Sequence, residues 1–357
     1  MSERAAERSG ETGKADARGR GEAEGENTAT SALDARHAPE TLRDVGEFGL
    51  IDRVARQALQ SPTVLLGPGD DAALVAAPDG RVVASTDLLL QGRHFRTDWS
   101  TAYQVGRKAA AQNLADIAAM GAVPTALLIG LAAPADLPVT WAQELAAGLA
   151  DECALVGVSV AGGDTTRADS IMIAVTALGD LRGHAPVTRS GAHPGDRVAI
   201  VGELGWSACG YQLLASGAAG PQKALARHRV PEPPYAQGPL AAEAGATAMI
   251  DVSDGLLADL GHIARESDVG IDVEPGAFAI PEQLRTTADR LGIDPLVWIL
   301  TGGEDHALAA CYPAAADIPP GWTVIGTVHK RSADQSAPRV TVAGKAWIGA
   351  QGWDHFA

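Results

Sequence analysis

The sequence predicts an α+β protein with two folded domains. The chain has 357 residues, which is more than one hydrophobic core usually serves. Strand-like and helix-like segments mix along it without the strict strand–helix alternation of a doubly wound sheet. Glycines and prolines cluster at residues 180–195 and interrupt these segments. We therefore expect a tail over residues 1–44, one domain over 45–186 and a second over 187–357.

The tail is rich in Glu, Arg, Ala, Gly and Ser and has almost no large apolar side chains. Such a segment buries too little apolar surface to offset the entropy lost on ordering, so we expect it to be disordered. No apolar stretch typical of a signal peptide is visible in it. Order is expected near Gly46, where apolar residues recur at helical spacing over residues 48–59.

In the first domain, short apolar runs predict strands and longer periodic segments predict helices. The predicted strands are 63–66, 72–76, 81–86, 125–131, 159–161 and 171–178, and the predicted helices are 102–120 and 140–156. The uncharged run 117–135 contains two prolines and many small residues. It therefore predicts a helix end, a turn and a buried strand rather than a membrane span.

In the second domain the same criteria predict six strands and four helices. The strands are expected at 196–201, 248–251, 270–273, 306–310, 322–328 and 339–342, the first of them opening the domain. The helices are expected at 206–216, 239–246, 254–266 and 281–291, with a proline-rich surface loop near 231–234.

Charge and cysteine content exclude several classes of protein. The formal net charge is −16, so binding to nucleic acid by general neutralisation of phosphates is not expected. The cysteines Cys153, Cys209 and Cys311 are widely spaced, which argues against a disulfide framework and is typical of a reducing compartment. We expect a cytoplasmic protein in which these thiols are buried and inert.

Six segments place Asp or Glu beside small or glycine-rich residues. They are GPGDDAA (67–73), STDLLLQGRHF (85–95), NLADIAAMGA (113–122), GGDTT (162–166), DVSDGL (251–256) and GGEDHAL (302–308). Asp87, Asp164 and Asp251 each follow an apolar run, and we expect each to end a buried strand. A carboxylate there is costly unless it is paired or bound to a cation.

A hard divalent cation explains these acids better than arginine, because few basic residues lie near the motifs. Carboxylate, hydroxyl and carbonyl oxygens suit Mg²⁺, and glycines allow a phosphate to approach the backbone. The motifs thus predict several Mg²⁺ ions between an acidic protein and a polyphosphate. A P-loop, a G-x-G-x-x-G turn, the protein-kinase motifs and a zinc-type His/Cys cluster are all absent from the sequence.

With TRSGA (188–192) and GWDHF (352–356), these motifs resemble the thiamine-monophosphate kinase family from about Gly46 to the C-terminus. This family shares a superfamily with aminoimidazole-ribotide synthetase and selenophosphate synthetase. The resemblance implies an aminoimidazole-ribotide synthetase-like fold, with an N-terminal α/β domain whose sheet dimerises and a C-terminal α+β domain. It implies a homodimer that uses ATP and Mg²⁺ to phosphorylate thiamine monophosphate directly, in line, to thiamine diphosphate, the last step of thiamine diphosphate biosynthesis.

The resemblance also implies roles for particular residues. The implied metal ligands are Asp70, Ser85, Thr86, Asp87, Asp116, Asp164 and Asp251, with Asp254 on a further metal. The implied ATP contacts are Gly163, Asp164, Arg189 and Ser253, and the implied thiamine monophosphate contacts are His94, Glu304 and Trp353. The chain departs from the family pattern at Gln91 and His306. No general base is needed, because a phosphate monoester with a second pKa of about 6 is already ionised near neutral pH.

Each residue also has a simpler interpretation. Asp70 and Asp71 could be a turn pair, Asp116 a surface acid, and Asp259 a solvated or supporting acid. Ser253 and Asp254 could cap the helix over 254–266. Arg189 could form a surface ion pair, His94 could be structural, Glu304 and Asp305 could cap a turn, and Trp353 could anchor the C-terminus in the core.

Two other functions remain open on the sequence alone. An ATP-dependent amide-activating synthetase would keep the ATP and metal motifs but take another acceptor. A metal- or nucleotide-binding scaffold without turnover would keep binding and tolerate Asp164→Asn. The acceptor-side segments GRHF, GGED and GWDHF favour the kinase over the synthetase.

Overall fold

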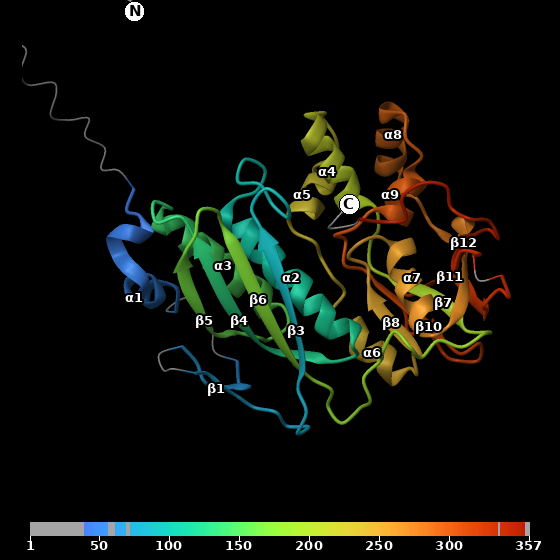
Figure 1. The fold of residues 1–357 in the computed structure, drawn as a ribbon, viewed down its shortest axis with the longest axis horizontal. Helices are drawn as coiled ribbons and strands as arrows, with labels where there is room; N and C mark the ends of the chain where they lie inside the picture. The colour runs from blue at the N-terminus through green and yellow to red at the C-terminus, as the bar shows by residue number, and fades with distance from the viewer. Residues whose placement is uncertain (1–38, 56–60, 69–71, 335, 354–357) are drawn as a thin grey trace, which may run out of the picture. The chain divides into compact units, whose positions relative to one another are not determined.

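The structure is a computed structural model that describes residues 39–55, 61–68, 72–334 and 336–353 (Figure 1). Pro39–Ala357 cluster as one compact unit. Most of the predicted tail lies outside the described residues. Helix α1 (Leu42–Ala55) begins earlier than the expected start near Gly46, because Thr41 donates through Oγ1 to Asp44 Oδ2 at its first turn, 2.7 Å. Gly46, at φ 66°, bends this helix.

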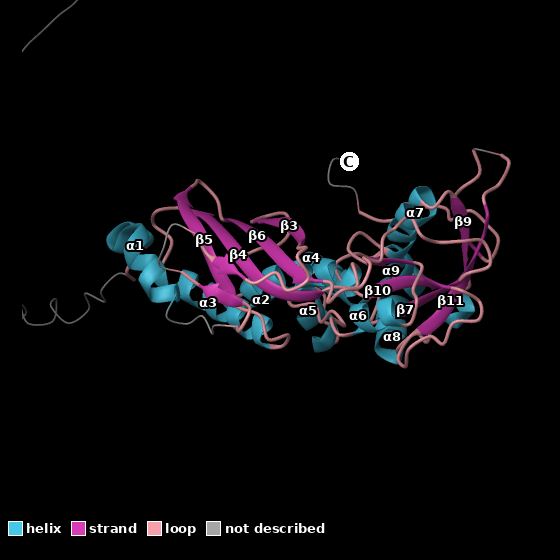
Figure 2. Ribbon diagram, turned by 90° about the horizontal axis from the view of Figure 1, so that it is seen from below, coloured by secondary structure: helices cyan, strands magenta, loops and turns pink. Residues whose placement is uncertain are grey.

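The first half of the unit contains a four-stranded and a two-stranded sheet. Its further elements are β1 (Val64–Leu66), β2 (Leu74–Val75), β3 (Val83–Leu90), α2 (Ala102–Ala119), β4 (Val123–Ala133), α3 (Val139–Ala154), β5 (Val160–Arg167) and β6 (Met172–Asp180). The larger sheet has the order β3-β6-β4-β5, in which β4 and β5 are parallel and the other pairs antiparallel. Helices α2 and α3 lie on one face of it (Figure 2).

The two faces of this sheet differ in burial, as expected when helices cover one face. On β6, Ile173, Val175 and Ala177 are buried beneath the helices. On the opposite face, β1 and β2 pack beside Leu128 and Leu178. Leu88 of β3, which pairs with Ala174 on that opposite face, remains 49% exposed. The sheet therefore presents one partly uncovered apolar face.

The second half is built on a six-stranded sheet. Its elements are β7 (Arg197–Val201), α4 (Trp206–Ser216), α5 (Gln222–Arg229), α6 (Gln237–Glu243), β8 (Ala248–Asp251), α7 (Leu256–Glu266), β9 (Val269–Val273), η1 (Pro275–Ala277), α8 (Glu282–Leu291), α9 (Pro295–Thr301), β10 (Leu308–Tyr312), β11 (Thr323–Lys330) and β12 (Val340–Val342). The strand order is β12-β9-β11-β7-β10-β8, and β12–β9 is the parallel pair. Helix α7 packs against β8, β9 and β12.

Helix α2 contacts both large sheets. Leu114 and Ile117 belong to the core beneath the four-stranded sheet. Ala118 and Ala119, at the end of the same helix, pack instead with Met249 and other residues of the six-stranded sheet. A helix rich in alanine can be buried on most of its surface because its small side chains let several elements approach closely. Polar side chains on α2 are thereby held beside segments from both halves of the chain.

The α+β class predicted from the sequence is confirmed, but two strands are longer than expected. Strand β3 continues through Asp87 to Leu90, and β5 continues through the GGDTT segment to Arg167. Asp87 and Asp164 therefore lie within strands, and the prediction that they end strands was wrong; Asp251 does end β8. Both long strands are edge strands, where polar side chains keep contact with water while the backbone pairing continues.

Helices α5 and α9 were not predicted. Helix α5 is short and strongly polar, so it lacks an apolar period, and its stability depends on packing against α4. Helix α9 begins with Pro295 after Asp294, whose side chain accepts the amide of Leu296, a start signal visible in the sequence. The uncharged run 117–135 forms the end of α2, a turn and β4, and none of the described helices is long and apolar enough to span a membrane.

Candidate active site

One face of α2 carries three polar side chains at four-residue intervals: Lys108, Gln112 and Asp116. Residues spaced in this way lie on one side of a helix. Each of the three contacts a different segment of the chain: Lys108 pairs with Glu304, Gln112 donates to Asp87, and Asp116 accepts from Ser85. This face of α2 therefore joins two groups of side chains, one rich in carboxylates and one around Glu304.

The first group gathers three of the predicted metal ligands. Ser85 Oγ donates to Asp116 Oδ2 at 2.6 Å, and Gln112 Nε2 donates to Asp87 Oδ2 at 3.1 Å. Burial, and then the charges of Asp251 and Asp87, raise the pKa of Asp116 to about 7. Carboxylates held close enough to disfavour each other's ionisation are a recurrent property of metal and catalytic sites. The interpretation of Asp116 as a plain surface acid is therefore wrong.

His306 faces this carboxylate cluster. Its Nδ1 lies 3.0 Å from Oδ2 of Asp251, and both side chains are buried. Burial alone would lower the pKa of His306, but the hydrogen bond to Asp251 and the nearby charges of Asp251 and Asp116 raise it. A chargeable ring therefore lies beside a predicted metal ligand.

The start of α7 differs from the predicted cap. The helix begins at Leu256 after Gly255 at φ 134°, and neither Ser253 nor Asp254 caps it with a side chain. Asp259 instead accepts the amides of Asp254 and Gly255 through Oδ2, at 3.1 and 3.0 Å. Asp259 is buried rather than solvated, and burial followed by the charge of Asp251 raises its pKa to about 8.

Asp254 lies in a second polar group at this helix. Ligand-type atoms of Asp254, Asp259 and His262 lie within 4.8 Å of one another. Burial, then Arg265 and Arg189, lower the pKa of His262, which places Arg189 within electrostatic reach of the group. Ser253 and Asp254 therefore lie at the start of α7, whereas the carbonyl oxygen of Arg189 accepts from Ser267 Oγ at the other end of this helix, at 2.8 Å.

Trp353 reaches the same region through its backbone. Its amide donates to the carbonyl oxygen of Asp254 at 2.9 Å. Its side chain is 55% exposed, so the interpretation that Trp353 anchors the C-terminus in the core is wrong.

The second group on α2 surrounds Glu304. Oε1 of Glu304 lies 3.0 Å from Lys108 Nζ, and Oε2 lies 3.5 Å from His228 Nδ1. Burial alone would raise the pKa of Glu304, but the charges of Lys108 and His228 and the hydrogen bond from Lys108 lower it. Glu304 also has a φ of 63°, a strained conformation for a residue with a side chain. The carboxylate is therefore ionised and held in place at neutral pH.

His94 lies beside this group. Its carbonyl oxygen accepts a hydrogen bond from Lys108 Nζ at 3.1 Å. Its ring Nδ1 accepts the amide of Leu90 at 3.0 Å, so the neutral ring carries its proton on Nε2. Asp305 has a separate role: it accepts the amides of Gly205 and Ser207 at the start of α4, at 2.6 and 2.8 Å. The turn-capping interpretation therefore applies to Asp305 and not to Glu304.

Several predicted ligands lie outside these groups. Thr86 Oγ1 donates to the carbonyl oxygen of Val175, on the face opposite Ser85 and Asp87. Asp164 is exposed on β5, and β6 and β4 separate it from β3, so it lies about 14 Å from Asp87 across the sheet. Gly163 is required by packing, since a Cβ there would overlap the carbonyl oxygen of Ile129. Asp70 and Asp71 lie outside the described residues.

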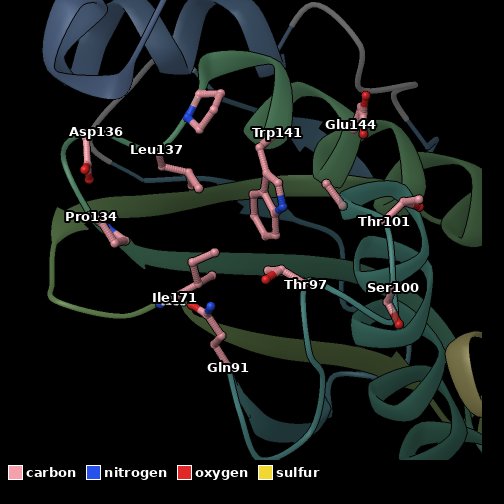
Figure 3. Close-up of a pocket in the computed structure, with 12 residues that line it drawn as sticks. Gln91, Thr97, Ser100, Thr101, Pro134, Asp136, Leu137, Trp141, Glu144 and Ile171 are labelled. Atoms are coloured by element: carbon pink, nitrogen blue, oxygen red, sulfur yellow. Dashed lines mark hydrogen bonds between the residues drawn. The ribbon is translucent and has the colours of Figure 1, made fainter. Parts of the chain in front are cut away.

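A separate cavity of about 490 Å³ lies at the starts of α2 and α3 (Figure 3). Trp141, Leu137 and Ile171 contribute apolar side chains to it, and Asp136 and Glu144 contribute carboxylates. None of the predicted site residues lines it.

Sequence reasoning missed Lys108, Gln112 and His228, which hold the predicted site residues in place. The signal for the first two was present, because polar residues at four-residue intervals interrupt an alanine-rich helix. His228 had no comparable signal, since its segment lies far from the site residues in the sequence and reaches them only through the fold.

The fold and the carboxylate cluster first indicate the broad class of proteins to which the chain is similar. Residues 69–181 match the family model described as "AIR synthase related protein, N-terminal domain". The chain is 52% identical to thiamine-monophosphate kinase from Mycobacterium tuberculosis over 317 residues, covering 88% of this chain and 93% of that protein. It is 40% identical to the Corynebacterium glutamicum thiamine-monophosphate kinase, covering 88% of this chain and 95% of that one.

Solved structures agree with these relatives. The crystal structure of thiamine-monophosphate kinase from Stenotrophomonas maltophilia matches with a TM-score of 0.72 at 32% identity, covering 85% of this chain and 98% of that one. A structure described as "AaThiL complexed with AMPPCP and TMP" matches with a TM-score of 0.71 at 31% identity, covering 89% and 99%. The chain belongs to the thiamine-monophosphate kinase family.

Proposed function

We propose that this chain transfers the terminal phosphoryl group of ATP to thiamine monophosphate and releases thiamine diphosphate. The observation that carries the proposal is the arrangement on α2, where the carboxylate cluster at Asp116 and the Glu304 group at Lys108 share one helix face. Eight residues separate these positions, which corresponds to about 12 Å along the helix. That distance suits an acceptor whose phosphate lies at the cluster and whose rings extend toward Glu304. The family relatives, one of them described in complex with AMPPCP and TMP, support the same reaction.

Magnesium ions fit the carboxylate cluster by its donor chemistry. Asp87, Asp116 and Asp251 offer hard oxygen atoms, with the hydroxyl of Ser85 beside them, and burial together with the charges of Asp251 and Asp87 raises the pKa of Asp116. We propose that these four residues hold Mg²⁺, with Asp254 on a further ion. Bound Mg²⁺ would neutralise the phosphates and the charge that develops during transfer.

The remaining predicted ligands carry less support from this chain alone. Thr86 faces away from the cluster with its side chain, so it can reach an ion there only through its backbone. Asp70, Asp164 and Gly163 stay proposals from the family resemblance, for metal or ATP. Ser253 is proposed as an ATP contact because it precedes the start of α7, where a helix N-terminus favours phosphate. Arg189 is proposed as an ATP contact from the family resemblance.

The acceptor is proposed to contact His94, Glu304 and Trp353. Glu304 is ionised and one-third exposed, at 34%, so it can meet the cationic thiazolium or the aminopyrimidine. His94 holds a proton on Nε2, and the indole of Trp353 is available for stacking. The chain then needs no general base, because the acceptor phosphate is already ionised, and its residues bind and align the two substrates.

We also propose a homodimer and a domain boundary. The four-stranded and six-stranded sheets are each confined to one side of residues 186 and 187, which supports domains over 45–186 and 187–357. The partly uncovered face of the four-stranded sheet, with Leu88 on it, supports pairing of two copies through their first domains. A cytoplasmic location remains a prediction, which fractionation of cells producing the protein would test.

The experiment that tests the function is a product assay. Purified protein is incubated with thiamine monophosphate and ATP, with Mg²⁺ or with a chelator, and the products are separated by chromatography. Magnesium-dependent thiamine diphosphate, lost in Asp87→Asn, is the expected result. ATP hydrolysis or binding without thiamine diphosphate would instead move the function to another acceptor.

A further inference from the structure

Lys108 is a buried lysine whose ammonium group has three partners. It lies in α2 with its side chain 3% exposed. Its Nζ donates to the carbonyl oxygens of His94 and His228, at 3.1 and 3.3 Å, and lies 3.0 Å from Oε1 of Glu304. A lysine ammonium group has three N–H donors, so this set uses all of them. A buried charge without such partners would be strongly unfavourable.

The partners of Lys108 are the two acceptor-side residues and the segment behind them. His94 and Glu304 come from distant parts of the sequence, and both are proposed to contact thiamine monophosphate. His228, whose carbonyl oxygen is the third partner, also places its ring Nδ1 3.5 Å from Oε2 of Glu304. One ammonium group therefore sets the separation of the two proposed acceptor contacts.

Lys108 itself is too deeply buried to meet a substrate, whereas Glu304 is one-third exposed, at 34%. Any effect of Lys108 on the acceptor must therefore pass through its partners. Glu304 needs such support, because its φ of 63° is strained and its amide is held by the carbonyl oxygen of Ser253, at 2.7 Å. The ion pair orients the carboxylate that the backbone conformation presents.

We infer that Lys108 is a positioning residue that holds Glu304 and the His94 segment for the thiamine end of the acceptor. The inference rests on the proposed function and adds to it a residue that touches neither substrate. The competing explanation is that Lys108 only links the two halves of the chain and has no effect on the acceptor site. The structure contains a second buried link of that kind, in which Tyr235 Oη donates to Glu152 Oε1 at 2.6 Å, a hydrogen bond between two residues that are not among the proposed site residues. Tyr235 therefore provides a matched control.

The test compares steady-state constants of the full chain with both substrates varied. Lys108→Met is expected to raise the KM for thiamine monophosphate about tenfold or more, because the charged hydrogen bonds that orient Glu304 are lost. The KM for ATP is expected to change by less than about twofold, because the substitution leaves the binding of ATP unchanged. Tyr235→Phe is expected to lower Tm while leaving both KM values within about twofold.

A double-mutant cycle separates positioning from general destabilisation. If Lys108 acts through Glu304, Lys108→Met in a Glu304→Gln background raises the KM by less than about threefold, a smaller factor than in the wild type. Lys108→Arg keeps the charge and is expected to recover part of the affinity for thiamine monophosphate. If Lys108→Met does not fold, Lys108→Arg must still show the KM increase confined to thiamine monophosphate.

Three results would overturn the inference: an unchanged or lowered KM for thiamine monophosphate in the folded Lys108 variants, an equal rise in both KM values, or equal factors in the two backgrounds. Wild-type turnover in the same assay reports the proposed function separately. If the wild type makes no thiamine diphosphate, the proposed function fails and the inference fails with it. If the wild type is active and the Lys108 variants are unaffected, only the inference fails.

Discussion

Nδ1 of His306 lies 3.0 Å from Oδ2 of Asp251, and the two buried side chains come from segments 55 residues apart. This pair gives Asp251 one chargeable partner, while Asp116 and Asp87 face the same region. One imidazolium cannot balance three carboxylates, so the cluster stays acidic when all of them are ionised. The free energy of unfolding and the activity are therefore expected to respond oppositely to loss of a carboxylate.

Asp116→Asn is expected to lower magnesium-dependent turnover about 100-fold or more, because a carboxylate that is proposed to hold Mg²⁺ is lost. The same change is expected to stabilise the metal-free protein. The folded pKa of Asp116, about 7, lies above its ordinary value of 3.8. The contribution of this group to stability is thus present below its ordinary pKa and is lost as pH rises through 7.

Thermal unfolding in chelator measures this effect. The variant is expected to exceed the wild type in Tm by roughly 2 °C or more at pH 8, and the difference is expected to shrink toward pH 4. A variant that is less stable than the wild type at pH 8 would contradict the expectation that the ionised carboxylate of Asp116 destabilises the metal-free protein.

His228→Asn tests a shift of the opposite sign. Burial, and then the charge of Lys108, lower the pKa of His228 to about 4 from 6.5. The neutral ring therefore contributes stability that is present above pH 6.5 and is lost as pH falls toward 4. Between pH 6.5 and 5, the wild type is expected to lose about 2 kcal/mol of unfolding free energy relative to the variant. Urea unfolding at these two pH values gives the difference, and a difference independent of pH would contradict the prediction.

Gly106→Ala is expected to destabilise the protein by about 2 kcal/mol or more, because α2 and α3 touch at this position. A Cβ at Gly106 would overlap the carbonyl oxygen of Leu145 in α3. Gly261, inside α7, has nothing within 4 Å of a Cβ position. Gly261→Ala is therefore the matched control and is expected to stabilise by about 0.4 to 1 kcal/mol. Denaturant unfolding of both variants checks the contrast, and equal effects would rule out the close helix contact as the cause.

Leu88→Arg is expected to prevent dimer formation, because a charge would be buried in the proposed sheet-to-sheet interface. Leu155→Arg is the control, since Leu155 is also exposed, at 64%, but follows α3 rather than lying in β3. Sedimentation velocity of the wild type and both variants measures the oligomeric state. A monomeric wild type, or a dimer that survives Leu88→Arg, would refute an interface at this face.

Much of the fold followed from local patterns in the sequence. Helix α4 was predicted with the bounds that it has, and α2, α3 and most strands were placed within a few residues, because burial on one side imposes a readable period. The strands predicted at β3 and β5 were too short, because polar residues within them were interpreted as strand ends. An edge strand tolerates such residues, and only the neighbouring elements reveal that it is an edge.

The candidate site could also be predicted only in part from the sequence. The acidic motifs and the family that they resemble were evident from the sequence, since glycine stands beside aspartate in several of its segments. Which of these acids meet depends on how the chain folds: Asp87, Asp116 and Asp251 come together, while Asp164 lies on the far edge of the sheet.

The residues that support the proposed acceptor contacts are likewise brought together by the fold. Lys108 and His228 are 120 residues apart along the chain, and no local pattern connects either of them with Glu304. Their contact arises because α2 packs against both sheets at once. A period in the sequence records which side of an element is buried, but the identity of the partner that buries it depends on distant segments and is settled only when the chain is folded.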